Sequence, residues 1–163
     1  MADNYMQIDG LKGESTDSEH KDWIELLSFS HSISQPASAT AASAGGGTTS
    51  RCQHGDYLIT KYVDLASPKL YELCSSGKHI KDVTIEMMRA SGDKRVKYMV
   101  VKMEQVVISQ VAPAGGGADF PTESISFNYG TIKWTYTQQK RTDGSQGGNT
   151  AAGWSLVENK TAA

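Results

Sequence analysis

Apolar and polar side chains alternate with a period of two along most of this 163-residue chain, and that period predicts β-strands. In residues 82–89 one face is apolar: Val83, Ile85 and Met87. Residues 97–111 repeat the pattern over a longer span, and Gly92-Asp93 between the two runs predicts a hairpin turn. Shorter runs predict further strands at 5–9, 23–33, 57–61, 125–136 and 153–158. The chain is therefore expected to be mainly β, with at least seven strands that are mostly antiparallel.

The long run at 97–111 has two different faces. One face carries five apolar side chains and is expected to face the core: Met99, Val101, Met103, Val107 and Val111. The other face mixes charged with aliphatic and aromatic side chains: Tyr98, Val100, Lys102, Glu104, Val106 and Ile108. A mixed face of this kind is typical of a strand that meets a partner or lines a channel.

The apolar parity changes within residues 125–136. Two sets of residues have opposite parity, with Gly130 between them: Ile125, Phe127 and Tyr129, then Ile132, Trp134 and Tyr136. A one-residue slip at a glycine predicts a β-bulge, and bulges bend strands where barrels close.

One segment predicts a short helix at about 68–76. Ser67 is a suitable N-cap, Pro68 is tolerated at the first helical position, and Gly77 is suited to the end. Three side chains share one face of this helix and are expected to close one side of a barrel: Leu70, Leu73 and Cys74.

Three stretches consist largely of small and polar residues and are predicted to be loops. The longest is an Ala/Ser/Gly-rich segment at about 34–50, which cannot supply a core and is expected to be a long excursion between strands. Residues 112–120 and 141–153 are similar but shorter.

Composition and charge exclude several classes of partner. A net charge of −2 and a pI near 6.1, without clustered Lys and Arg, give no footprint for nucleic acid or acidic lipid. No run approaches 18 apolar residues, so membrane insertion is not expected. The N-terminus lacks the features of a signal peptide, and Cys52 and Cys74 are too few for a disulfide framework. The sequence therefore predicts a protein made in the cytoplasm.

No arrangement of residues predicts a catalytic, cofactor or metal site. Cys52-x-His54 and Cys74-x4-His79 are the only soft-ligand pairs, and four-ligand zinc spacings do not occur. Phosphate-binding and nucleophile motifs are also missing, so the chain is not expected to be an enzyme. Two alternatives remain on the residues alone: a monomeric β-barrel binding module of lectin or pilus type, and a small β-barrel hydrolase.

Four ordered blocks of the chain resemble the haemolysin-coregulated protein (Hcp) family of type VI secretion systems. The first is Lys12-Gly13-Glu14-Ser15 with the acidic, histidine-containing turn to His20 and the Trp23 strand. The others are residues 61–79, residues 122–129 and Gly153-Trp154-Ser155-Leu156. Together they span nearly the whole chain.

This resemblance implies one domain over residues 1–163, a β-barrel of two antiparallel sheets with one short helix. It also implies homohexameric rings that stack into the inner tube of the secretion system. The tube is expected to be secreted without a signal peptide, to carry and chaperone effector proteins in its lumen, and to contact the spike and sheath proteins.

The ring suggests roles for two groups of residues. The mixed strand face provides candidates for the lumen or the subunit seam, Lys102 and Glu104. The glycine-rich loops provide candidates for contacts between stacked rings: Gly45, Gly46, Gly47, Gly115, Gly116 and Gly117.

Overall fold

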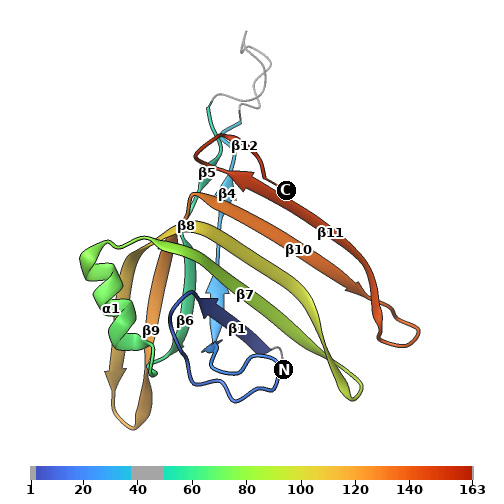
Figure 1. Ribbon diagram of the computed structural model, residues 1–163, viewed down its shortest axis with the longest axis horizontal. Coiled ribbons are helices and arrows are strands. Elements are labelled where there is room, and N and C mark those ends of the chain that lie inside the picture. The colour runs from blue at the N-terminus through green and yellow to red at the C-terminus, as the bar shows by residue number, and fades with distance from the viewer. Residues whose placement is uncertain (1–2, 38–49, 163) are drawn as a thin grey trace.

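The alternating segments form twelve strands and one α-helix in the computed structural model, which describes residues 3–37 and 50–162 (Figure 1). Within these residues the strands are β1 Asp3–Ile8, β2 Ile24–Leu26, β3 Ser28–Ser30, β4 Ile33–Ser34, β5 Gln53–His54, β6 Tyr57–Tyr62, β7 Ile80–Ser91, β8 Lys94–Gly116, β9 Asp119–Asn128, β10 Thr131–Gln139, β11 Gln146–Ser155 and β12 Lys160–Thr161. Helix α1 spans Ser67–Ser76. The mainly β prediction with one short helix is confirmed.

All strand pairs are antiparallel, and their pairings close a barrel. Sheet A has the order β12-β11-β10-β8-β7-β1-β2, and sheet B has the order β3-β6-β9-β8, so that the long strand β8 belongs to both. Strands β2 and β3 are consecutive, and the Leu27 N–H between them donates to the Thr60 carbonyl at 2.8 Å. Because β2 pairs with β1 while β3 pairs with β6, this segment joins the two sheets on the side opposite β8.

Strand β8 passes from sheet A to sheet B at Gln105, which has a left-handed φ of 55°. Gln105 occupies one position of the strand but does not continue the pleat. The residues that face the core therefore change from odd to even numbers directly after it. Val101 and Met103 are buried as predicted, but beyond Gln105 the buried residues are Val106 and Ile108. The predicted core position Val107 is therefore wrong, since it pairs with Asn128 on the outward face. Val111 packs against the core as predicted, because a register irregularity between Ile108 and Gln110 restores the original parity.

The predicted bulge at Gly130 is instead a break between two strands. Strand β9 ends at Asn128 in sheet B, and β10 begins at Thr131 in sheet A. The Gly130 N–H points to the carbonyls of Glu104 and Gln105, at 3.0 and 3.2 Å. The parity change seen in the sequence at Gly130 thus marks the same corner as Gln105, where the chain changes sheets.

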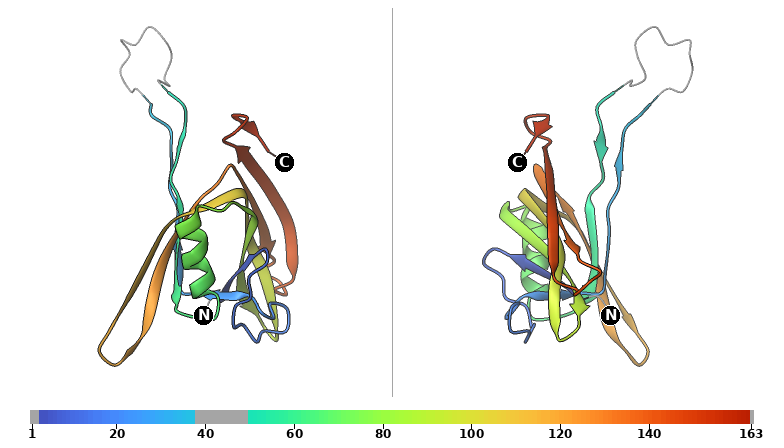
Figure 2. Two further views of the ribbon diagram at one scale, coloured as in Figure 1. Left: turned by 60° about the vertical axis from the view of Figure 1, so that its left-hand side comes forward. Right: turned by 90° about the vertical axis from the view of Figure 1, so that its right-hand side faces the viewer.

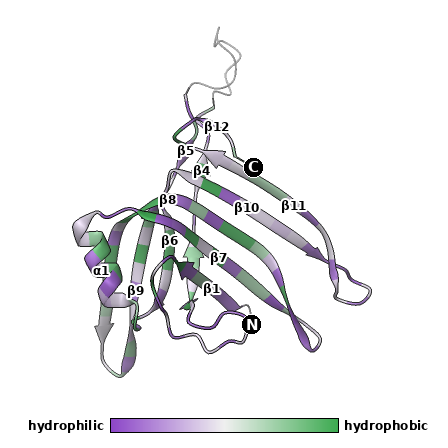
Figure 3. Cartoon of the chain, viewed as in Figure 1, coloured by the Kyte–Doolittle hydropathy of each residue, from purple (hydrophilic) through white to green (hydrophobic). Residues whose placement is uncertain are grey.

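The core fills the barrel, and α1 closes one side of it (Figure 2). Hydrophobic and hydrophilic residues alternate along β7 and β8 (Figure 3). The inward side chains include Met6, Ile24, Ile59, Ile85, Met103, Phe127 and Ile132, with Leu70 and Leu73 from the helix. The N-cap prediction is wrong, because Ala66 holds that position and the Ser67 hydroxyl bonds elsewhere. Gly77 ends the helix with a left-handed φ of 65°.

Two of the three predicted loops are mostly strands. Residues 112–120 form the end of the β8–β9 hairpin, whose turn contains Gly117 with φ of 72°. Most of residues 141–153 belong to β11, which pairs with β10 along its length. Small residues have weak strand propensity, but pairing with a neighbouring strand overrides it. Conversely, the predicted strand at 23–33 is divided into β2, β3 and β4.

The long predicted loop at 34–50 begins and ends in a two-stranded ribbon. Strands β4 and β5 pair through Ile33 with His54 and Ser34 with Gln53. We call residues 32–37 and 50–54 the arm. The arm points away from the barrel at the end opposite the tip of the β8–β9 hairpin (Figure 2). Gly45, Gly46 and Gly47 lie outside the described residues.

Candidate assembly surfaces

Sheet B has an unpaired edge on each side. Within the described residues, β3 pairs only with β6, and residues 107–116 of β8 pair only with β9. An unpaired strand edge presents backbone N–H and carbonyl groups that another strand can pair with. Within the described residues, a third unpaired edge runs along residues 146–152 of β11. The segment that begins with β12 contacts only the end of this strand, where the Ala162 N–H donates to the Gly153 carbonyl. The molecule therefore carries surfaces suited to strand-to-strand contact with other chains.

Exposed apolar side chains accompany the β3 edge. Leu27 is 47% exposed and Phe29 is 43% exposed. Large apolar side chains gathered on an open edge are a mark of an interface. Phe29 also lies over the Tyr57 ring at a centroid distance of 6.1 Å, which fixes its position on the barrel.

The outward face of sheet B is lined by hydroxyl and amide side chains. Residues that are directly paired across strands have their side chains on the same face. The register places these residues opposite the core: Ser28, Ser30, Thr60, Thr122, Ser124, Ser126 and Asn128. Leu58 and Tyr62 share this face. No charged side chain lies on the outward face of β3, β6 and residues 122–128 of β9.

The predicted candidates Lys102 and Glu104 lie in another place. Both are on the part of β8 that belongs to sheet A, with their side chains directed away from the core. Glu104 forms an ion pair with Lys133 of β10, with Nζ 3.3 Å from Oε1, and Lys102 is exposed. They share no face with the hydroxyl-lined surface of sheet B.

The structure describes three of the six glycines that are predicted to contact stacked rings. Gly115 and Gly116 lie at the end of β8, and Gly117 is in the turn to β9, so the three glycines occupy the hairpin tip. This tip and the arm are at opposite ends of the molecule (Figure 2). The two predicted stacking elements therefore do not meet within one chain.

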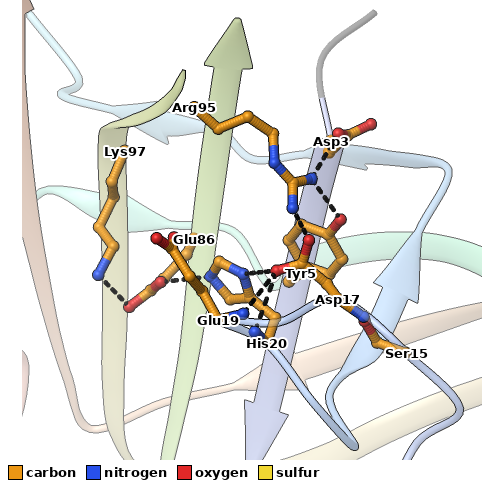
Figure 4. A network of polar contacts seen from close by, with 9 residues as sticks. All are labelled: Asp3, Tyr5, Ser15, Asp17, Glu19, His20, Glu86, Arg95 and Lys97. Carbon is orange, nitrogen blue, oxygen red and sulfur yellow. Dashed lines mark hydrogen bonds and ion pairs between the residues drawn. The ribbon is translucent and has the colours of Figure 1, made fainter. Parts of the chain in front are cut away.

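The segment at 13–20 is held on the barrel by a buried polar network (Figure 4). His20 is buried, and its Nδ1 lies 2.9 Å from Asp17 Oδ1 while its Nε2 lies 2.7 Å from Glu86 Oε2. The imidazole thus bridges a carboxylate of the 13–20 segment to a carboxylate of strand β7. The imidazole also stacks on Tyr5 at 4.3 Å.

Two basic residues complete this network. Arg95 donates to Asp3 Oδ2 at 2.9 Å and pairs with Asp17, and Lys97 lies 2.8 Å from Glu86 Oε1. Each of the three carboxylates of this network, Asp3, Asp17 and Glu86, therefore contacts Arg95 or Lys97. Glu14, by contrast, is exposed and free to contact another molecule.

A second polar cluster joins β6, β9 and α1 inside the barrel wall. The Lys61 and Glu123 side chains are 0% exposed, with Nζ 2.6 Å from Oε1, and Asp64 Oδ1 lies 2.7 Å from the same ammonium. Ser67 and Tyr71 donate hydrogen bonds to the Glu123 carboxylate. Burial raises the pKa of Glu123, but the hydrogen bonds from Lys61, Ser67 and Tyr71 outweigh it and hold that pKa below its usual range.

This cluster ties the helix to the barrel. A local pattern indicates this cluster, because Lys61 has the same parity as the core residues Tyr57 and Ile59. Lys61 and Ser67 are close enough to form a nucleophile pair, but both are buried. Within the described residues, their side chains bond to each other, to Asp64, to Glu123 and to the Tyr62 carbonyl.

A protein-family model described as "Type VI secretion system effector, Hcp" matches residues 5–136. "Protein hcp1" of Pseudomonas aeruginosa strain PAO1 is 33% identical over 158 residues, which cover 96% of each chain. The chain belongs to the Hcp family. The resemblance found in the sequence is confirmed.

Solved structures of Hcp proteins have the same fold. A protein described as "Structure of a type six secretion system protein" aligns with a TM-score of 0.91 at 32% identity, covering 99% of this chain and 100% of the other. Hcp1 from Salmonella typhimurium aligns with a TM-score of 0.81 at 29% identity, covering 99% of both chains. A relative at 27% identity, from the same Pseudomonas strain, is called "Major exported protein". Hcp proteins are secreted components of type VI secretion systems, and Hcp is not a known enzyme family.

In residues 3–37 and 50–162, no three His, Cys, Asp or Glu side chains are arranged to hold a metal ion. In the same residues no helix has the length and apolar character needed to span a bilayer.

The buried glycine of the Hcp motif gives a direct test of its structural role. A Cβ at Gly13 would lie 2.3 Å from the Trp23 carbonyl oxygen and 2.8 Å from the Ile24 Cα. Because backbone atoms cannot move aside, Gly13→Ala is expected to lower the free energy of unfolding by about 1–3 kcal/mol in urea denaturation. Gly148→Ala, where the added Cβ meets nothing within 4 Å, is the control. Equal stability of the two variants would contradict this assignment.

Proposed function

We propose that this Hcp chain is the ring-forming tube subunit of its type VI secretion system. The observation that carries the proposal is that sheet B is open at two different edges, β3 on one side and residues 107–116 of β8 on the other. A contact between unlike edges is heterologous, and repeated heterologous contacts close a ring when the rotation divides a full turn. Both edges lie within the residues that match the family, whereas the β11 edge lies beyond them.

In this ring the β3 edge of one subunit meets the β8 edge of the next. Six copies then join their B sheets into one continuous wall, and no B-sheet edge stays unpaired. The uncharged, hydroxyl-lined face of sheet B faces the lumen and contacts effector proteins. Lys102 and Glu104 lie on the outward face of sheet A, where β8 is paired on both sides, so this ring assigns them neither to the strand-to-strand seam nor to the lumen.

Stacking of rings uses the two opposite ends of the subunit. The arm, with Gly45, Gly46 and Gly47, reaches the neighbouring ring at one end, and the tip with Gly115, Gly116 and Gly117 does so at the other. A stack built in this way has one direction, so each arm meets the hairpin end of the next ring. The tube then joins the spike and sheath proteins and leaves the cell through the apparatus.

A bulky residue at the hairpin tip should block stacking and spare the ring. Ala118 follows Gly117 in the turn and is exposed, so Ala118→Trp is expected to leave ring mass unchanged and to abolish growth into tubes. Gly46→Trp should have the same effect from the arm. Thr142→Trp, in the β10–β11 turn, is the control. Tubes of normal length from Ala118→Trp would show that the tip makes no stacking contact.

The ring itself is tested by electron microscopy of the purified chain. Particles with a central hole and six-fold symmetry are expected, with stacks at high concentration. Solid particles the size of one barrel at every concentration would remove the tube-subunit proposal and favour a monomeric binding module.

A further inference from the structure

Two histidines at the base of the arm contact the same hydroxyl group on the barrel. His31 Nε2 lies 2.5 Å from the Tyr129 hydroxyl oxygen, and His54 Nδ1 lies 3.3 Å from the same atom. His31 and His54 flank the arm at its base, one on each of its two chain segments. Tyr129 is the corner residue between sheets B and A, so this cluster is where the arm joins both sheets.

The hydrogen-bond pattern is satisfied by two neutral histidines. The Tyr129 hydroxyl donates its one hydrogen to the Gly55 carbonyl at 3.1 Å, which leaves its lone pairs to accept. Each histidine then donates one N–H, and a neutral imidazole has one N–H to give. The cluster therefore needs no positive charge to hold together.

The surroundings of the pair are unfavourable to charge. His31 packs against Tyr57 of β6 at 5.1 Å and Trp134 of β10 at 6.5 Å, measured between ring centroids. The carboxylate on this side, Asp56, is already bonded to Ser109 of β8 at 2.6 Å and Asn128 of β9 at 3.0 Å. The titratable groups of the arm next to His54 are Cys52 and the cationic Arg51. Neither histidine forms an ion pair within the described residues.

Both pKa values shift in the direction that this packing requires. Burial lowers the pKa of His31 below its usual value, and the nearby His54 lowers it further; together they outweigh a hydrogen bond with the Gly55 backbone, which raises that pKa. Burial also lowers the pKa of His54. A histidine with a lowered pKa stabilises the folded contact above pH 6.5, and that stability is lost as the pH falls through the lowered value.

We propose that the His31–His54 pair is an acid-sensitive contact that holds the arm on the barrel and releases it when both imidazoles are protonated. Two like charges then surround one hydroxyl that cannot neutralise either of them, and Arg51 adds a third positive charge on the same ribbon. Given the stacking role of the arm in the proposed function, acid separates stacked rings. The rings persist, because the edges of sheet B contain no histidine.

Hydrogen exchange of the arm tests the release without depending on assembly. The Gly55 N–H donates to Ser32 at 2.9 Å across the base of the arm. Exchange by mass spectrometry, corrected for intrinsic pH dependence, should show protection of residues 53–56 falling at least about tenfold from pH 7.5 to 5. Protection of the β6 core around Ile59 should not change. Constant protection at residues 53–56 would overturn the proposal.

The effect on stacking is tested by sedimentation of tubes over the same pH range. Wild-type tubes are expected to fall apart into rings below pH 6.5, while the double variant His31→Gln with His54→Gln keeps its tubes at pH 5. Glutamine retains an N–H donor toward Tyr129 and cannot take up the proton. His79→Gln, at an exposed position after α1, is the matched control and should respond to acid as wild type does.

The outcomes separate this inference from the proposed function. Tubes that persist at pH 5 in the wild type, or that fall apart equally in the double variant, would overturn the proposal that the histidine pair is an acid-sensitive contact. A chain that forms no ring at pH 8 would instead overturn the tube-subunit proposal, and hydrogen exchange would still decide whether acid releases the arm.

Discussion

Replacing Lys61 with methionine is expected to lower the free energy of unfolding by about 3–5 kcal/mol, which is the usual cost of breaking a fully buried ion pair. Methionine keeps the length and volume of the side chain, so packing changes little. The cost arises because the Glu123 carboxylate stays buried and loses the ammonium 2.6 Å away. Urea denaturation at pH 7 measures the change.

Two comparisons separate charge from packing. Adding Glu123→Leu to Lys61→Met should restore much of the stability, since an apolar pair leaves no unpaired charge. Lys69→Met breaks an exposed pair with Glu72 on the same helix and should cost less than about 1 kcal/mol. A loss for Lys61→Met no larger than that of Lys69→Met would show that the buried pair is not a main support of the fold.

As the pH falls, the free energy of unfolding should change in opposite directions in the wild type and in Lys61→Met. In the wild type the pKa of Glu123 is lowered, so the stability that it contributes is present above about pH 4.5 and is lost as the pH falls further. In Lys61→Met the carboxyl is buried without its cation, which raises its pKa. The variant should therefore gain stability relative to wild type as the pH falls and Glu123 becomes neutral.

Phe29→Glu is expected to convert the ring into monomers. The side chain stands on the free β3 edge, where the proposed seam would bury it, and burying an unpaired carboxylate costs several kcal/mol per ion. That penalty recurs at each of the six seams. The isolated subunit should remain folded, because Phe29 is 43% exposed on the single chain. Sedimentation and far-UV circular dichroism together report on assembly and fold.

Val157→Glu provides the control, because Val157 is 68% exposed beyond the end of β11 and lies on neither edge of sheet B. It should form rings like the wild type. Rings of full mass from Phe29→Glu would place the seam elsewhere, and the unpaired edge of β11 would then be the next surface to test.

Much of the fold follows from local sequence patterns. The period of two in residues 82–89 matches the buried side chains of β7, and Pro68 with Gly77 delimits α1 correctly to within one residue. Gln105 could not be foreseen, because nothing in a polar residue within a strand indicates a left-handed φ. One such residue reversed the faces of Val106 and Ile108, and an irregularity between Ile108 and Gln110 then restored the original parity at Val111. Residues 112–116 have the composition of a loop and become strand only because β9 pairs with them.

The assembly surfaces depend even more on topology. The resemblance of four blocks indicated the family, but Gly13, Ser15 and His20 of the first block prove to be buried and hold the barrel together. The two open edges of sheet B are formed by segments about 80 residues apart, and no local pattern shows that one sheet contains both. His31 and His54 likewise meet only through Tyr129, which is contributed by a distant corner.

Sedimentation velocity of the purified wild-type chain at several micromolar and pH 8 tests the central claim most directly. Six copies of a 17.6 kDa chain predict a single main species of about 106 kDa. A species of that mass is the result expected if the two edges of sheet B join in a closed ring. A single 17.6 kDa species at every concentration would contradict the claim, because both edges would then remain unpaired in solution.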